Sequence, residues 1–166
     1  TQGYSSAASD VYKRQVGYDS NGKPRHAHKR GTVTNNPYKG NAAGSQPEFS
    51  FHWHGTSDKI YLFEAPIDML SYISMHKENW KEHSYAASCS VSDRVLFQCL
   101  KDNPNIKNVF LCFDNDEAGQ TANKRIADKL NSMNIKSAIL IPIHKDWNED
   151  LTLTEKEDEQ ICHQAL

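Results

Sequence analysis

Three acidic residues follow apolar runs of the kind that form buried strands, and their types suit metal chemistry. Glu64 comes directly after residues 60–63, and Asp114 and Asp116 come after residues 109–113. Side chains two residues apart in an extended chain point the same way, so the two aspartates can present their carboxylates to one cation. Carboxylate oxygens suit Mg²⁺ or Mn²⁺, which can share phosphate oxygens with a substrate. We therefore expect a magnesium or manganese site, with Glu64 completing it or moving a proton.

The Asp-x-Asp pair has other interpretations when it is taken alone. Either aspartate could instead cap a helix that starts at Glu117 or Ala118, because aspartate is a preferred N-cap residue. A phosphohydrolase with Asp114 as its nucleophile is a further alternative, although Ala118 is not the residue usual there. An EF-hand is excluded, since the positions that should bind calcium are Ala118 and Arg125. The sequence contains no Walker-type phosphate-binding loop.

The elements that must position these carboxylates alternate between strands and helices. Pro66 opens the first helix in the position that proline tolerates best, and the third helix ends near residue 134. Such alternation predicts an α/β fold with a parallel sheet and helices on both faces. Ligands bind beyond the carboxyl ends of such strands, so Glu64 and Asp114 are expected on one edge. The expected strands cover residues 60–63, 85–89, 109–113 and 138–142.

The composition is that of a soluble globular protein. The chain has 166 residues, of which 37% are hydrophobic and 24% are charged. No apolar run approaches the length of about 20 residues that a membrane helix needs, and no secretory signal is recognisable. The four cysteines form no CxxC pair, which argues against a cysteine-based zinc site. We expect a cytoplasmic protein without a membrane partner.

Charge is distributed unevenly along the chain. Residues 16–56 hold five basic and two acidic residues, whereas residues 57–166 hold 12 basic and 18 acidic residues. Lys23, Arg25, Lys29 and Arg30 form a basic cluster that could contact nucleic-acid phosphates. The alternative is a solvated hairpin edge, where positive charge guards against aggregation.

The N-terminal part has a different character. Residues 1–15 resemble a translated sequencing adapter, and we interpret them as a non-native or disordered tail, so that the natural protein would be longer. In residues 16–56 the Asn21-Gly22 pair predicts a β-hairpin. Phe49, Phe51 and Trp53 alternate with polar residues, which predicts a strand with an aromatic face.

Three segments together resemble the Toprim domain of bacterial primases, topoisomerases and related nucleases: residues 60–68, 109–120 and 145–151. The likeness is strongest to primase-like Toprim proteins of mobile genetic elements, because Gly-Tyr-Asp-x-x-Gly-Lys-Pro at 17–24 and Ala-Gly-Ser at 43–45 precede the core. The resemblance implies a Rossmann-like Toprim domain at 57–151. A small β-rich appendage at 16–56, the end of a truncated upstream domain, would precede it, and a helical tail would occupy 152–166.

The resemblance also implies roles for single residues. Glu64 matches the general acid or base, Asp114 and Asp116 match the metal-binding pair, and Asp146 matches a further acidic position. The supporting positions are Asp68, Gly119, Lys145 and Asn148. The sequence departs from the family at Ala65, where glycine is usual, and at Trp147-Asn148, where many primases have proline and aspartate.

The function that the resemblance implies is metal-dependent nucleotidyl transfer of the primase kind, in replication or conjugative transfer of a mobile element. DNA or RNA, nucleotides and other domains of a longer protein would be the partners. Two alternatives stay open: a Toprim nuclease, and a module that binds nucleic acid or nucleotides without catalysis. Whether the chain is an enzyme is therefore not decided by its sequence.

Overall fold

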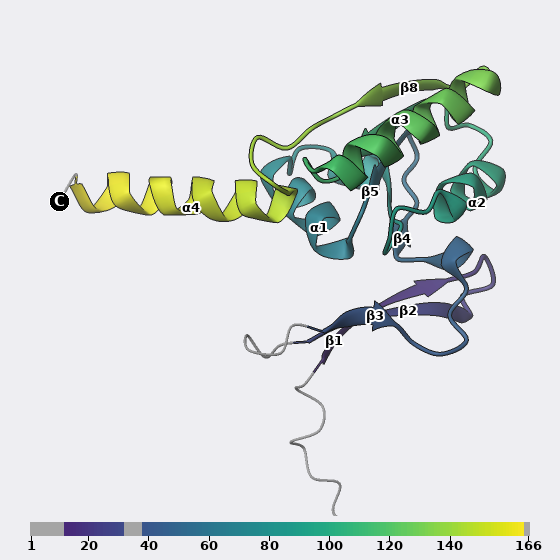
Figure 1. Cartoon of the computed structure of the whole chain (residues 1–166), viewed down its shortest axis with the longest axis horizontal. Coiled ribbons are helices and arrows are strands. Elements are labelled where there is room, and N and C mark those ends of the chain that lie inside the picture. The colour runs from purple at the N-terminus through teal and green to yellow at the C-terminus, as the bar shows by residue number, and fades with distance from the viewer. Residues whose placement is uncertain (1–11, 32–37, 165–166) are drawn as a thin grey trace, which may run out of the picture.

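The computed structural model describes residues 12–31 and 38–164. A small antiparallel sheet lies against one side of a larger α/β unit, and the last helix projects from that unit (Figure 1). This arrangement confirms the predicted α/β fold with a small β-rich appendage. Within the described residues, no helix has the length and apolar character needed to cross a membrane.

The N-terminal sheet has the order β1-β2-β3, with β1 at Tyr12–Tyr18, β2 at Pro24–Gly31 and β3 at Lys39–Asn41. Its first turn confirms the predicted hairpin, because Gly22 has a φ of 72° and the Asp19 carboxylate accepts hydrogen bonds from the amides of Asn21 and Lys23. Strand β1 begins at Tyr12, so the boundary expected after Gln15 falls inside a strand.

The segment that joins the two sheets differs from the prediction. Residues Pro47–Phe49 form a 3-10 helix, and only His52–Trp53 form a strand, β4. The expectation of a continuous strand through Phe49, Phe51 and Trp53 is therefore wrong in its first half. Pro47 stands at the start of the 3-10 helix, where its fixed φ and missing N–H favour a turn over sheet pairing.

The larger sheet has the order β4-β6-β5-β7-β8. Strands β5 (Lys59–Phe63), β6 (Ser84–Ala87), β7 (Asn108–Cys112) and β8 (Lys136–Ile139) run parallel, while β4 is antiparallel to β6. The connecting helices are α1 (Pro66–Met75), α2 (Arg94–Asp102) and α3 (Glu117–Ser132), and a 3-10 turn covers Trp80–Glu82. The predicted alternation of strands and helices is confirmed.

Both faces of the central strands are buried. Ile60 and Leu62 of β5 pack with Leu96 of α2 and Ile126 of α3 on one face. On the other face, Tyr61 and Phe63 pack with Met69 and Tyr72 of α1 and with Trp147 of α4. A strand buried on both faces must be apolar throughout, which explains why β5 and β7 are readable as continuous hydrophobic runs.

Helix α4 (Trp147–Gln164) begins five residues before the helical tail expected from Thr152. Its first turn therefore belongs to the motif at 145–151. Asp146 begins the helix, because its Oδ1 accepts a hydrogen bond from the Glu149 amide at 2.8 Å. Figure 1 shows the helix running outward from α1.

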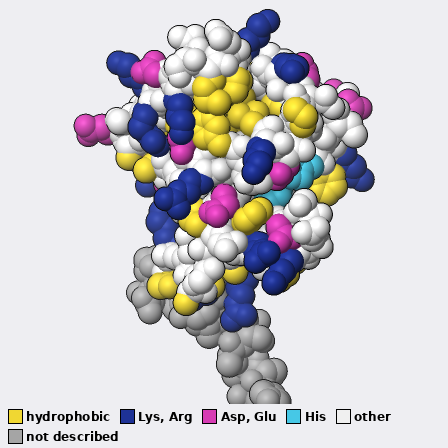
Figure 2. Space-filling model, turned by 90° about the vertical axis from the view of Figure 1, so that its right-hand side faces the viewer, with side chains coloured by type: hydrophobic (Ala, Val, Ile, Leu, Met, Phe, Trp, Pro, Cys, Tyr) yellow, Lys and Arg dark blue, Asp and Glu magenta, His cyan; other side chains and the backbone are white. Residues whose placement is uncertain are grey.

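Charged side chains do not gather by sign on the face that Figure 2 shows. Lysine and arginine side chains are spread between acidic ones, and hydrophobic side chains form a patch in the upper part of the view. This face of the molecule therefore presents no patch of a single charge sign.

Candidate active site

The strand order creates a crevice where the chain reverses its direction of winding. After β5 the chain passes through α1 to β6 on one side, and then through α2 to β7 on the other side of β5. The helices that leave two such neighbouring strands diverge to opposite faces of the sheet, which opens a ligand crevice at their carboxyl ends. Glu64 directly follows β5 and Asp114 follows β7, so both lie at this point, as predicted.

A cleft of about 430 Å³ lies between this edge of the large sheet and the N-terminal sheet. Four carboxylates line it: Glu64, Asp68, Asp114 and Asp146. Three basic residues line it as well, namely Arg30, Lys39 and Lys145. The structure therefore brings together most of the predicted acidic residues, and adds basic groups from the N-terminal sheet.

Asp114 has the least favourable surroundings for a charged carboxylate among the residues that line the cleft. Its Oδ1 is buried and has no hydrogen-bond partner among the described residues. Burial and, after it, the negative charges of Asp68, Glu64, Asp146 and Asp116 together raise the pKa of Asp114 to about 7. The site thus opposes the charged form of Asp114 unless a positive group lies nearby.

Asp68 is almost fully buried beneath the cleft. Burial raises its pKa to about 6, and the charge of Asp146 acts in the same direction. Its Oδ1 accepts a hydrogen bond of 3.4 Å from the Asn148 amide, and the Ser71 hydroxyl donates to Oδ1 of Asn148 at 3.4 Å. Asp68 and Asn148 therefore connect α1 to the first turn of α4, and the supporting role expected of both stays a prediction.

Asp116 and Asp146 each begin a helix. Oδ1 of Asp116 accepts a hydrogen bond from the Gly119 amide at 2.8 Å, as Asp146 does from the Glu149 amide. The alternative that Asp116 is an N-cap is thus correct, although its second carboxylate oxygen remains for another contact. Among residues 12–31 and 38–164, no three His, Cys, Asp or Glu side chains converge into a ready-made metal site. The carboxylates line one cleft but do not meet at one point.

Glu64 is half-buried at the mouth of this cleft. Burial raises its pKa, the charges of Lys39 and Lys145 lower it, and those of Asp116 and Asp146 raise it again. The Ser88 hydroxyl lies 3.3 Å from the Glu64 carbonyl oxygen and 3.2 Å from that of Phe63, which ties the loop after β6 to the end of β5. Ala65 has a φ of −128°, so alanine replaces the usual glycine here without backbone strain.

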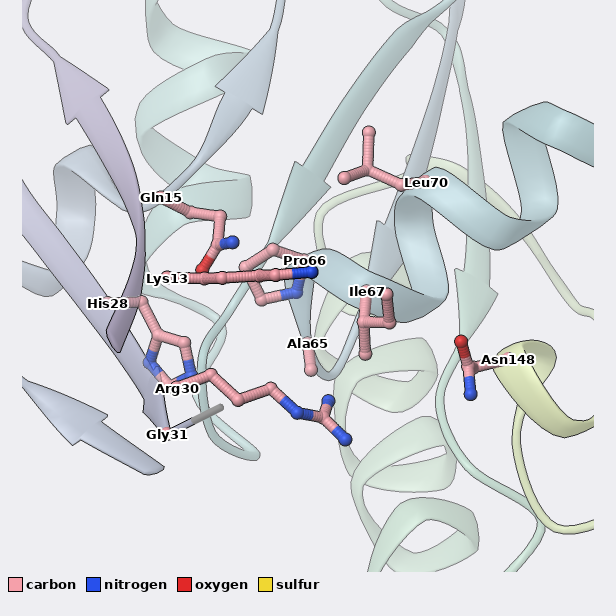
Figure 3. A pocket seen from close by; sticks show the side chains of 10 residues that line it. All are labelled: Lys13, Gln15, His28, Arg30, Gly31, Ala65, Pro66, Ile67, Leu70 and Asn148. Carbon is pink, nitrogen blue, oxygen red and sulfur yellow. The ribbon is translucent and has the colours of Figure 1, made fainter. Parts of the chain in front are cut away.

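The predicted basic cluster does not form a single patch. Alternation along β2 buries His26 and His28 and separates Arg30 from Arg25 and Lys29. Figure 3 shows Arg30 and His28 on the side of the hairpin that faces the start of α1, around an adjoining cavity of about 280 Å³. Arg25 forms an ion pair of 2.7 Å with Asp19 instead. Nucleic-acid binding by these residues stays a prediction, with Arg30 alone of the cluster at the cleft.

Several residues of the site were not identified from the sequence. Lys39 of β3 lines the cleft, and the Trp147 indole donates a 2.9 Å hydrogen bond to the Cys112 carbonyl oxygen below it. Asp150 accepts hydrogen bonds from the amides of Ile143 and His144, which hold the loop before α4. No local pattern signals Lys39, whereas an aspartate one turn into a helix is a detectable signal for Asp150.

Gly119 lies where α3 passes over the loop that carries Asp114. A Cβ at Gly119 would stand 2.2 Å from the Asp114 carbonyl oxygen, so the loop would have to move. We expect Gly119→Ala to lower the free energy of unfolding by about 1–3 kcal/mol, as overpacking does. Urea unfolding of both proteins measures this. Ala118→Ser on the exposed adjacent position is the control, and an equal loss there would contradict the steric explanation.

The raised pKa values make stability depend on pH. Asp114 holds its proton to about pH 7 in the folded chain, while the unfolded chain releases it near its ordinary value of 3.8. Between pH 3.8 and about pH 7 the folded state therefore binds more protons than the unfolded state. The stability of the folded state falls as the pH rises through this range. We expect Asp114→Asn to raise the melting temperature of the metal-free chain by several degrees near pH 7.5 and little near pH 4.5.

Thermal unfolding in EDTA at the two pH values measures this difference. The unsubstituted chain alone would not show this effect, because three histidines act in the opposite direction. Burial lowers the pKa values of His26, His54 and His83, so their contribution makes the stability of the chain rise with pH. These histidines are common to both proteins and cancel in the difference. An equal effect of the substitution at both pH values would contradict the assignment.

Sequence comparison matches two known families to the chain. Residues 61–151 match the family described as Toprim-like, and residues 12–57 match a family described as a protein of unknown function, DUF3991. An uncharacterized protein of Bacillus anthracis is 25% identical over 153 residues, covering 80% of this chain and 44% of that protein. The chain thus spans less than half the length of this curated relative.

Structure comparison finds primases. The primase fragment of the bacteriophage T7 primase-helicase protein is 20% identical with a TM-score of 0.65, covering 93% of this chain and 62% of that one. T7 primase domains bound to an RNA/DNA hybrid and dTTP are 21% identical with a TM-score of 0.60, with coverage of 92% and 76%. The Aquifex aeolicus primase is 16% identical with a TM-score of 0.62, with coverage of 90% and 39%. These likenesses show a shared fold.

Proposed function

The chain belongs to the Toprim-like family, and from this premise we propose that it is a Mg²⁺-dependent domain for nucleotidyl transfer of the primase kind. The observation that carries the proposal is the cleft in which four carboxylates face Arg30, Lys39 and Lys145. Acidic groups for a cation beside basic groups for phosphates are what phosphoryl transfer to or from a nucleotide requires.

The chemistry of the donor set fits a hard divalent cation. A buried oxygen of Asp114 has no hydrogen-bond partner among the described residues, and burial, together with neighbouring carboxylates, raises the pKa values of Asp114 and Asp68. We propose that Asp114 and Asp146 of the cleft hold Mg²⁺ together with Asp116, which lies two residues after Asp114, and that Mn²⁺ is an alternative. When bound, the cation would stabilise negative charge on the phosphoryl group that is transferred.

The remaining steps belong to side chains of the chain itself. Glu64 accepts the proton of the attacking hydroxyl group, and its raised pKa makes it a better proton acceptor than an ordinary glutamate. Arg30, Lys39 and Lys145 neutralise and orient the phosphates of nucleotide and strand. Asp68 and Asn148 hold α1 and α4 together below the cleft.

The similar solved structures support a proposal on the substrates and the process in which the chain acts. The similar solved structures are primases, one of them with an RNA/DNA hybrid and a nucleotide. We therefore propose DNA or RNA and nucleotides as partners, with further domains of a longer protein supplying the rest of the template surface. We place this in cytoplasmic replication or conjugative transfer of a mobile element.

The test is primer synthesis by the 166-residue chain on single-stranded DNA with nucleotides and Mg²⁺. We expect labelled oligonucleotides that disappear with EDTA and in Glu64→Gln, which keeps the shape of the side chain. Glu82→Gln, at an exposed position outside the cleft, is the matched control. Shortened template without new product would identify a nuclease instead.

A non-catalytic module is the second candidate function. It is favoured by the lack of three converging acidic side chains among the described residues, and by Asn148, which stands where many primases have a carboxylate. This candidate predicts that single-stranded DNA binds to the chain but that neither primer nor cleavage product forms. Fluorescence anisotropy with labelled DNA, run beside the synthesis assay, separates the two.

A further inference from the structure

Strand β8 forms one edge of the large sheet. It pairs with β7 on one side, and no strand of the described residues lies on its other side. All four of its residues are exposed, and Figure 1 shows the strand at the border of the α/β unit. An edge strand presents unpaired backbone N–H and C=O groups, which form a template for pairing with a further strand.

The backbone groups that point to the open edge belong to alternate residues of β8. Backbone groups alternate between the two sides of a strand, as side chains alternate between its two faces. The Leu140 amide donates to the Leu111 carbonyl oxygen at 2.9 Å, so the even-numbered residues direct their backbone groups toward β7. The N–H and C=O groups of Ser137 and Ile139 therefore point away from β7, and these are the groups that a further strand would bind.

The side chains along this edge are apolar and uncharged. Residues 137–143 contain no charged residue. Ile139 is 42% exposed, Ile141 is 49% exposed and Ile143 is 86% exposed. Burying such aliphatic surface is favourable, so an apolar strand laid along β8 would gain both backbone hydrogen bonds and apolar contacts.

The other sheet edges of the described residues carry protection that β8 lacks. Strand β1 holds Lys13 and Arg14, and β3 holds Lys39 among its three residues. Strand β4 has only two residues. Charged side chains and short length are the usual means by which an edge avoids pairing with another chain. Strand β8 has one lysine, Lys136, at its first position and apolar residues after it, which indicates an edge that another strand covers.

We propose that β8 pairs with β8 of a second copy of this chain, antiparallel and about a twofold axis at Ala138. In this register Ser137 of each copy lies opposite Ile139 of the other, so the outward backbone groups of both residues are paired. Lys136 lies opposite Leu140, and no two like charges face each other. An uncharged apolar edge is best matched by an uncharged apolar strand, and the chain itself supplies one of the same length.

The neighbouring elements leave room for this pairing. Helix α3 packs over β7 and β8. In the joined sheet the two copies of α3 would lie on one face, roughly 10–14 Å apart from the strand spacing, which accommodates helices about 10–12 Å wide. Because the two β8 strands run in opposite directions, the two acidic clefts would lie at opposite edges of the joined sheet. Pairing therefore leaves both clefts open and does not depend on a cation.

The test is sedimentation velocity of the 166-residue chain in EDTA over a wide range of concentrations. We expect a reversible change from one chain to two as the concentration rises. Ile139→Lys should weaken dimerisation by at least about 100-fold, because it removes apolar contact and places two lysines beside the axis. Val91→Lys, at an aliphatic residue that is also 42% exposed but lies on the loop after β6, should dimerise as the unsubstituted chain does. Circular dichroism checks that both variants keep the fold.

Amide hydrogen exchange separates strand pairing from other apolar association. The amides of Ser137 and Ile139 should exchange at least about tenfold more slowly in the dimer than in the dilute monomer, because pairing binds their N–H groups. The proposal is overturned if these amides exchange equally in both states, if Ile139→Lys dimerises as the unsubstituted chain does, or if assemblies larger than two chains form. A chain that stays monomeric at every concentration also overturns it and assigns the edge to a strand of another protein.

Discussion

Asp114→Asn should weaken Mg²⁺ binding by at least about 100-fold, because it removes the cleft carboxylate whose buried oxygen has no partner among the residues that the structure describes. Asparagine keeps the size of the side chain, so the fold should persist. The substitution would also remove the repulsion between Asp114 and the four neighbouring carboxylates that raise its pKa. Isothermal titration calorimetry of the 166-residue chain near pH 7.5 measures the change.

The matched control is Asp128→Asn, which removes an exposed carboxylate from the outer surface of α3. It should leave Mg²⁺ affinity unchanged. If both variants bind as the unsubstituted chain does, the cation is held elsewhere or by Asp116 and Asp146 alone. If the unsubstituted chain binds no Mg²⁺ even with nucleotide and single-stranded DNA present, the non-catalytic module becomes the better interpretation.

Trp147→Ala should lower the free energy of unfolding by about 3–5 kcal/mol, the range for a large aromatic side chain removed from a core. Trp147 is 7% exposed, and its ring meets that of Tyr72 edge-on at 5.0 Å. The substitution would also leave the Cys112 carbonyl oxygen without the indole donor. Urea unfolding monitored by circular dichroism gives the loss.

Two further variants separate packing from hydrogen bonding. Trp147→Phe keeps an aromatic ring but removes the donor, so it should cost about 1–3 kcal/mol. Trp53→Ala, at a tryptophan that is 41% exposed, should cost under about 1 kcal/mol. Equal losses at Trp147 and Trp53 would contradict the view that Trp147 anchors α4, and with it Asp146, to the sheet.

The core of the fold could be predicted from the sequence because its signals are local. Residues 60–63 and 109–113 are continuous apolar runs, as strands buried on both faces must be. Asn21-Gly22 is a turn whose backbone few other residues adopt, and Gly22 has the positive φ that it requires. These local signals suffice to assign the acidic residues after β5 and β7 to one edge of the sheet.

Signals near element ends were misleading, because propensity competes there with tertiary contacts. The alternating aromatic residues at 49–53 predicted a strand, but Pro47 starts a 3-10 helix that packs against α2. Asp146 caps helix α4, and the Trp147 indole fixes its first turn to a buried carbonyl of β7, a tertiary contact that no window of neighbouring residues can reveal.

The sequence by itself determined which residue types are available for chemistry and at which edge of the sheet they lie. Only the tertiary structure decided their environments: Asp116 and Asp146 cap helices, while Asp114 keeps a buried oxygen without a partner. It also decided that Arg30 and Lys39 face the cleft whereas Arg25 pairs with Asp19. The physical reason is that burial, pKa and pairing depend on neighbours brought together from distant segments, and strand order and sheet packing set those neighbours.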